Sequence, residues 1–193
     1  MANQITQGGA MQQGKPRVLR PSDGKKGMLG GMGVRLMIGG TDSGGGFALV
    51  EHPLPPRALG APLHRHKHED EYTYVIEGRI GALLGDDVVF GEAGDFIFKP
   101  RGEWHSFWNA GDEPARILEI ISPAGFERYF EEIIDMGGVA AMPPDAMREL
   151  RERYGLEMDL ASVPVLVERF GLAKPANPRD PGASRPPVAA SEI

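Results

Sequence analysis

Turn-forming residues interrupt the middle of this chain at short, regular intervals. Between about residues 79 and 121, glycine, proline and aspartate cluster four times, and short apolar or aromatic runs separate the clusters. Closely spaced strand signals with no helical period between them predict antiparallel strands in a sandwich or barrel. The predicted strands are 79–84, 87–90, 95–99, 104–109 and 115–121.

The first part of the chain continues this all-β pattern. We predict an edge strand over 17–20, then a glycine-rich loop, then strands over 34–38 and 47–52. Residues 1–15 are polar and rich in glutamine and glycine, and we predict a disordered tail there. The barrel is therefore expected over 16–122.

The pattern changes after residue 122. Ser122 and Pro123 suit the start of a helix, and apolar residues from Phe126 to Ile134 recur at helical spacing up to the Gly137-Gly138 stop. Further helices are expected over about 144–154 and 162–170, which gives a helical segment over 123–173. The proline-rich end, 174–193, is predicted to be disordered.

Composition narrows the classes of function. The net charge of −6 argues against a nucleic-acid-binding surface. The chain has no cysteine, which excludes disulfides, cysteine-ligated zinc and iron–sulfur clusters. No apolar run is long enough for a membrane span, and the first residues lack the apolar core of a signal peptide, so we expect a cytoplasmic protein that does not enter membranes.

A histidine-rich stretch, GAPLHRHKHEDEYTYVIEG over 60–78, carries the strongest chemical signal. In an extended segment His64 and His66 lie on the same face, because side chains alternate with period two. Imidazole and carboxylate are transition-metal ligands, and acidic residues follow immediately. Glu71 is the predicted carboxylate ligand, with Glu69 as the alternative if the register differs.

Of the three other histidines, one is a candidate ligand and two are not expected to bind the metal. His105 lies in a second strand–turn–strand unit, which could return it beside Glu71. His68 is expected to be exposed or to lie outside the ligand set. His52, isolated beside Pro53, is expected to be structural or solvated.

These stretches resemble the two signature motifs of the cupins. In the first, one residue separates His64 from His66, four separate His66 from Glu71, and six separate Glu71 from Gly78. The second runs from Gly94 to Asn109, with Pro100, Gly102 and His105 at the motif positions. The first motif departs at its leading glycine, where this chain has Ala58.

The resemblance implies an all-β, jelly-roll type cupin barrel followed by C-terminal helices. Its interior would hold one divalent transition metal (Fe, Mn, Ni, Co, Cu or Zn) on His64, His66, Glu71 and His105. A homodimer is also expected, with the glycine-rich N-terminal strands and the helix after Ser122 as candidate contacts.

Strand alternation suggests the substrate pocket. If Glu71 and His105 face inward, so should Thr73, Val75 and Phe107, which we predict to bind substrate. The facing of other large residues stays open at this stage: Phe47, Leu49, Phe96, Phe98, and Trp104 or Trp108.

Three functions fit these features. The chain looks like the quercetin 2,3-dioxygenase-like cupins, which implies a metal-dependent dioxygenase acting on an apolar or aromatic small molecule, with Glu71 also accepting a proton. The alternative is an isomerase, lyase or hydrolase acting on a polar molecule, which would need charged groups such as Lys99, Arg101 and Glu103 near the site. The third is a non-catalytic small-molecule-binding cupin.

Overall fold

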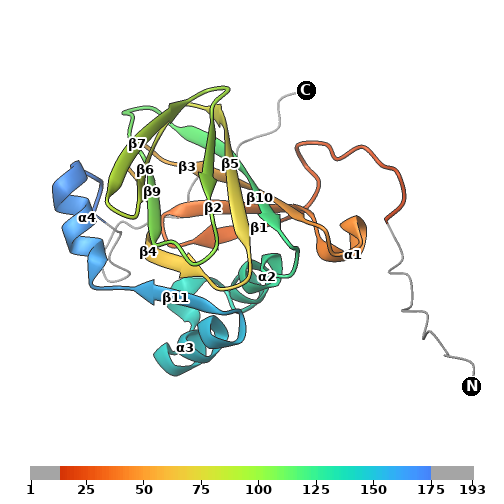
Figure 1. Cartoon of the computed structure of the whole chain (residues 1–193). Coiled ribbons are helices and arrows are strands. Elements are labelled where there is room, and N and C mark those ends of the chain that lie inside the picture. Colours follow the sequence, from red (N-terminus) through yellow and green to blue (C-terminus); the bar gives the residue numbers. More distant parts are fainter. Residues whose placement is uncertain (1–13, 175–193) are drawn as a thin grey trace, which may run out of the picture.

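Two antiparallel sheets, packed face to face, form the body of the protein. The computed structural model describes residues 14–174, and Figure 1 shows the sheets with helices at one end and one side. The strands form a two-sheet jelly roll and not one closed ring, because hydrogen bonds pair strands within each sheet. The all-β prediction with C-terminal helices is confirmed.

The larger sheet has six strands in the order β1–β2–β3–β10–β5–β8. Its central strands place alternate side chains toward the other sheet. The strands are β1 (Lys25–Leu29), β2 (Met32–Ile38), β3 (Ala48–Leu54), β5 (Asp70–Glu77), β8 (Phe96–Lys99) and β10 (Ala115–Ser122).

The smaller sheet has five strands in the order β11–β4–β9–β6–β7. Its edge strand β11 comes from the C-terminal segment and pairs with β4, which carries the histidine-rich stretch. The strands are β4 (Leu59–His66), β6 (Arg79–Leu84), β7 (Asp87–Glu92), β9 (His105–Asn109) and β11 (Leu156–Asp159).

Two strand predictions differ from the structure. Residues 17–20 are irregular, and the first strand lies within the predicted glycine-rich loop. Gly27 lies in that strand, where it packs on α2 (Glu127–Asp135). A Cβ at this position would lie 2.4 Å from Ile134 Cγ1, so glycine permits the close packing of β1 on α2. Strand β11 was not predicted.

The helices follow the predicted order, but the first begins later than expected. Helix α2 starts at Glu127 and not at Ser122–Pro123, and the Glu127 carboxylate accepts hydrogen bonds from the backbone N–H groups of Gly125 and Gly40. The predictions for the last two helices are confirmed by α3 (Pro144–Arg153) and α4 (Ser162–Phe170). A short helix, α1 (Gly40–Ser43), and a 3₁₀ turn, η1 (Val139–Ala141), complete the described elements.

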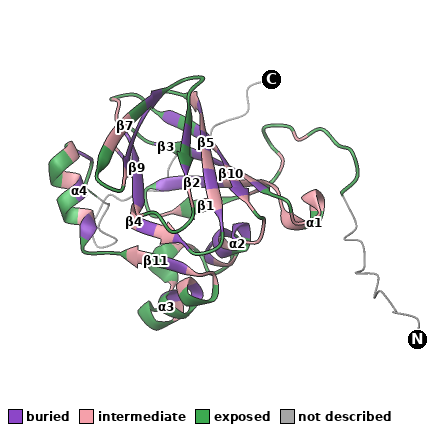
Figure 2. Ribbon diagram, in the orientation of Figure 1, coloured by how far each residue is buried: buried purple, intermediate pink, exposed green. Residues whose placement is uncertain are grey.

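Helices α2 and α3 cover one end of the sandwich, and α4 lies at one side (Figure 1). Helix α2 contacts β1, β2 and β3, α3 contacts β11, and α4 contacts β4. Figure 2 shows buried residues along the facing sides of the sheets and on the inner side of α2. The two elements proposed as dimer contacts, β1 and α2, thus pack on each other, and the dimer stays a prediction. No helix within residues 14–174 is long and apolar enough to cross a membrane.

Candidate metal centre

Strand β4 presents two histidines to the interior. His64 and His66 are buried, while Arg65 between them points outward and pairs with Glu157 of β11. This is the alternation expected of an extended chain. The two imidazole rings lie 5.2 Å apart between centroids.

His105 comes from the neighbouring strand of the same sheet. In the β4–β9 ladder, His105 is the direct cross-strand partner of His64, and their ring centroids are 4.2 Å apart. Gly60 on β4 accommodates the ring of Phe107, since a Cβ at Gly60 would lie 2.3 Å from Phe107 Cε2. The register brings the three imidazoles of this sheet together.

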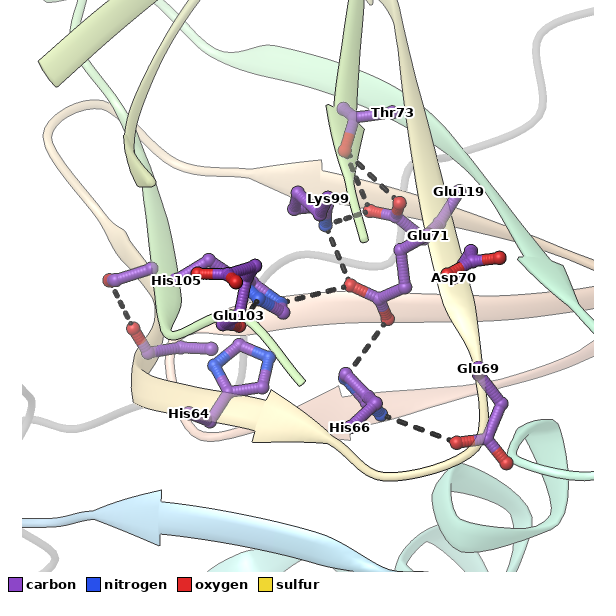
Figure 3. Close-up of polar contacts among 12 residues, drawn as sticks. His64, His66, Glu69, Asp70, Glu71, Thr73, Lys99, Glu103, His105 and Glu119 are labelled. Carbon is purple, nitrogen blue, oxygen red and sulfur yellow. Dashed lines mark hydrogen bonds and ion pairs between the residues drawn. The ribbon is translucent and has the colours of Figure 1, made fainter. Parts of the chain in front are cut away.

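Glu71 completes the cluster from the opposite sheet. It lies near the start of β5, after the turn that leads out of β4. Its carboxylate oxygens Oε1 and Oε2 lie 3.3 Å from His66 Nε2 and His105 Nε2, respectively. Figure 3 shows the side chains converging, and one donor atom from each of the four buried residues lies within 4.8 Å of the others.

The donor set fits a divalent metal ion. His64 Nδ1 and His105 Nδ1 each lie within 3.0 Å of a backbone carbonyl, those of Pro62 and Glu103. A carbonyl only accepts hydrogen bonds, so Nδ1 carries the proton and Nε2 keeps its lone pair toward the centre. His105 Nε2 and both nitrogens of His66 are buried without a hydrogen-bond partner in the described chain, which is costly unless a ligand is bound there.

The imidazoles of His64 and His66 are also neutral, as metal ligation requires. Burial lowers the pKa of His66 to about 4. Burial, together with the neighbouring imidazoles, holds the pKa of His64 well below its usual range. The sequence prediction placed these four residues in one site, and the structure brings all four together.

Behind Glu71 lies a charged network that sequence reasoning missed. Lys99 Nζ lies 2.8 Å from Glu71 Oε2 and 2.9 Å from Glu119 Oε2. Thr73 Oγ1 is 3.0 Å and 3.1 Å from the two oxygens of the Glu119 carboxylate (Figure 3). The Lys99 ammonium also lies over the ring of Phe107, 4.8 Å from its centroid. These buried groups therefore neutralise and orient the carboxylate ligand.

One ammonium shared between two carboxylates separates their pKa values. Burial alone would raise the pKa of Glu71, but the ammonium of Lys99 opposes this, and that pKa lies well below the usual range. Burial raises the pKa of Glu119 to about 7, although Lys99 opposes the shift. Glu71 is thus the ionised carboxylate at the cluster.

The other acidic and basic residues of the stretch point elsewhere. Glu69 Oε2 lies 3.9 Å from His66 Nδ1, on the far side of that ring from Glu71. Asp70 pairs with Arg101 at 2.6 Å on the surface. His68 is exposed. Glu71 is therefore the carboxylate at the cluster, and Glu69 is not grouped with the donors.

A cavity of about 450 Å³ adjoins the cluster, and His64, His66 and Glu71 line part of it. Most of the wall is apolar or aromatic and comes from both sheets and from the C-terminal helical segment. This lining includes Phe107, Phe126, Tyr129, Phe130, Ile133, Met147, Leu156 and Met158.

Of the three predicted substrate-binding residues, only Phe107 lines this cavity. Thr73 and Val75 face the interior as alternation required, but the structure places them outside the lining, since Thr73 is bonded to Glu119 and Val75 packs in the apolar core. The residues left open do not line it either: Phe47, Phe96 and Phe98 are exposed, Leu49 and Trp104 are half-buried, and Trp108 stacks on Phe170.

His52, which was expected to be structural or solvated, is buried and lines the cavity. It lies on β3, is 2% exposed, and its ring packs edge-on against Phe130. No motif marks it; the only sequence signal was its alternation with Val50 on a predicted strand.

Comparison with known proteins agrees with this geometry. The family model for the cupin domain matches residues 51–121, which contain β4, β5 and β9 and all four donors. Over this segment the chain is a cupin domain. A solved structure described as a predicted oxalate decarboxylase from Thermotoga maritima shares the fold, with a TM-score of 0.52 and 23% identity; the match covers 55% of this cupin and 99% of that chain.

Three curated proteins are similar in sequence to this cupin. The tetracenomycin polyketide synthase protein TcmJ of Streptomyces glaucescens is 37% identical over 60 residues, covering 31% of this chain and 40% of that protein. The polyketide synthase CurC of Streptomyces cyaneus is 28% identical over 118 residues, covering 58% and 73%. The quercetin 2,3-dioxygenase of Bacillus subtilis (strain 168) is 26% identical over 164 residues, covering 83% of this cupin but less than half, 46%, of that enzyme.

Proposed function

We propose that this cupin is a metal-dependent dioxygenase that acts on a small, hydroxylated aromatic molecule. One observation carries the proposal: a buried cluster of three imidazoles and one carboxylate opens on an apolar cavity of about 450 Å³. The size and lining suit an aromatic ligand with few polar contacts. The similarity to a quercetin 2,3-dioxygenase over 83% of the chain supports the reaction class.

The chain's own residues would divide the work. His64, His66, His105 and Glu71 would hold the metal, which when bound would polarise a substrate oxygen and accept dioxygen nearby. Lys99 keeps Glu71 ionised and fixed. The ionised state suits a ligand but makes Glu71 a weak base, so we assign it to metal binding ahead of the predicted proton transfer.

The aromatic wall would position the substrate and exclude water. Phe107 lies beside the cluster, and Phe126 packs edge-on against His66 at 4.3 Å between centroids. An apolar enclosure strengthens electrostatic interactions at the reacting oxygen.

A second candidate function is the modification of an aromatic polyketide. Two of the sequence relatives are polyketide synthase proteins by name, and one of them covers 58% of this cupin. The same apolar cavity would accept such a molecule, so this candidate differs in the reaction and not in the class of substrate.

The three charged residues that the polar-substrate alternative would use do not face the cavity. Lys99 is paired with Glu71 and Glu119, and Arg101 is paired with Asp70 on the surface. Glu103 is exposed. None of the three lines the cavity.

Oxygen consumption tests the dioxygenase proposal. Protein loaded separately with Fe, Mn, Ni, Co or Cu would be assayed in an oxygen electrode with quercetin and other flavonols, with His105→Ala as the control that lacks one ligand. We expect oxygen uptake with at least one metal and none with the control. Conversion of an aromatic polyketide without oxygen uptake would favour the second candidate.

A further inference from the structure

His52 is a polar group placed in an otherwise apolar part of the cavity. It lies on the inward face of β3, beside Ile117 of β10, and Phe130 of α2 packs against its ring. It is not grouped with the four donors, so metal binding does not account for it.

Its ring has a defined tautomer. His52 Nδ1 lies 3.0 Å from the backbone oxygen of Gly33. The carbonyl can only accept, so Nδ1–H donates, and Nε2 carries a lone pair. Burial lowers the pKa of His52 to about 4, so the ring is neutral near pH 7.

The Nε2 atom has no hydrogen-bond partner among residues 14–174. Unlike the nitrogens of His66, it is not among the fully buried atoms that lack a partner, so Nε2 keeps some accessible surface although His52 as a whole is only 2% exposed. Since His52 lines the cavity, the surface left on Nε2 opens into it. A hydrogen-bond acceptor therefore faces the cavity.

Glu119, another acceptor in the lining, is already engaged. Both oxygens of Glu119 accept hydrogen bonds from Thr73, and one also bonds to Lys99. Outside the four candidate metal donors, a ligand hydroxyl entering the cavity would therefore find a free acceptor at His52 Nε2.

We propose that His52 Nε2 accepts a hydrogen bond from a phenolic or enolic hydroxyl of the bound substrate, and so selects hydroxylated aromatics over their unsubstituted analogues. The proposal rests on the aromatic substrate class proposed above. It assigns His52 to substrate recognition and leaves metal binding and chemistry to the cluster.

The test compares 2-naphthol with naphthalene. Both would be titrated into zinc-loaded wild-type protein, His52→Phe and His52→Asn; asparagine keeps a donor for Gly33 but has no atom at Nε2. His68→Phe is the matched control, since His68 is exposed. We expect the wild-type preference for naphthol to fall about three- to tenfold in both His52 variants and to persist in the control.

Nitrogen-15 NMR of histidine-labelled wild-type protein supplies a measurement that needs no variant. The Nε2 resonance of His52 should shift with 2-naphthol and stay in place with naphthalene. An unchanged preference in both His52 variants, or an unmoved Nε2 resonance, would overturn the assignment while leaving the aromatic cavity intact. If neither compound binds, the assignment and the proposed aromatic substrate both fail.

Discussion

The two sheets contribute different chemistry to the interior. The smaller sheet supplies three imidazoles from β4 and β9, two of them oriented by backbone carbonyls two residues away. The larger sheet supplies charge: two carboxylates and an ammonium from β5, β8 and β10. Neutral donors need only local backbone bonds to be oriented, whereas buried charges require partners from neighbouring strands.

The largest effect should follow loss of the neutral donors. Replacing His64 and His66 together by alanine removes two of four ligands, and metal affinity should fall by more than roughly a hundredfold, since even outer partners of ligands are worth 10–100-fold. Elemental analysis and a chelator competition would measure this. His68→Ala is the control, and equal metal content in the double variant would refute the assigned site.

The buried charged residues of the larger sheet should matter more for stability than exposed ion pairs do. Lys99→Met leaves Glu71 and Glu119 buried without their cation, so the free energy of unfolding should drop by about 3–5 kcal/mol. Urea denaturation would measure it. Lys25→Met, which breaks exposed ion pairs with Asp135 and Glu131, should lower it far less, because solvent screens exposed pairs. Similar losses in both variants would contradict the distinction.

Acid should weaken the fold through the buried neutral imidazoles. The pKa of His52 is about 4 in the folded protein and about 6.5 in the unfolded chain, so the unfolded state binds more protons between these values. Its contribution, about 3 kcal/mol, is complete above pH 6.5 and is lost as pH falls toward 4. Urea melts of wild-type protein and His52→Asn from pH 7.5 to 4.5 should show a shallower pH dependence in the variant; parallel curves would exclude this role.

The smallest effect, on metal affinity, should follow substitution of Glu69, the acidic residue beside the cluster. Glu69→Gln removes a carboxylate 3.9 Å from His66 Nδ1, and metal affinity should fall by less than about tenfold. Glu71→Gln should cost more than roughly a hundredfold. Isothermal titration with zinc would compare them, and the reverse order would restore Glu69 as the ligand.

Much of the fold could be predicted because it is encoded locally. The strand over 79–84 and the helices over 144–153 and 162–170 follow from turn residues and periodicity. Strand β1 could not be predicted, because its glycine-rich sequence is typical of a loop and Gly27 is explained only by the packing of α2 against it. Strand β11 depends on the edge of β4, which lies 90 residues earlier along the chain.

Strand β8 shows where hydrophobic patterning misleads. Its sequence FIFK suggests that the phenylalanines face the core. Instead, Phe98 stacks on Tyr72 and Phe96 packs at a tilt against Tyr74, both phenylalanines are exposed, and Lys99 is buried. The charge of Lys99 is satisfied inside by Glu71 and Glu119, which is a property of the neighbouring strands and not of β8.

By itself, the sequence determined the four candidate metal donors, because strand alternation puts His64 and His66 on one face and the resemblance to the two cupin motifs adds Glu71 and His105. Only the tertiary structure decided what surrounds them. Lys99, Glu119 and His52 lie on strands far apart in the chain, and their roles depend on strand order and register, which no local pattern specifies.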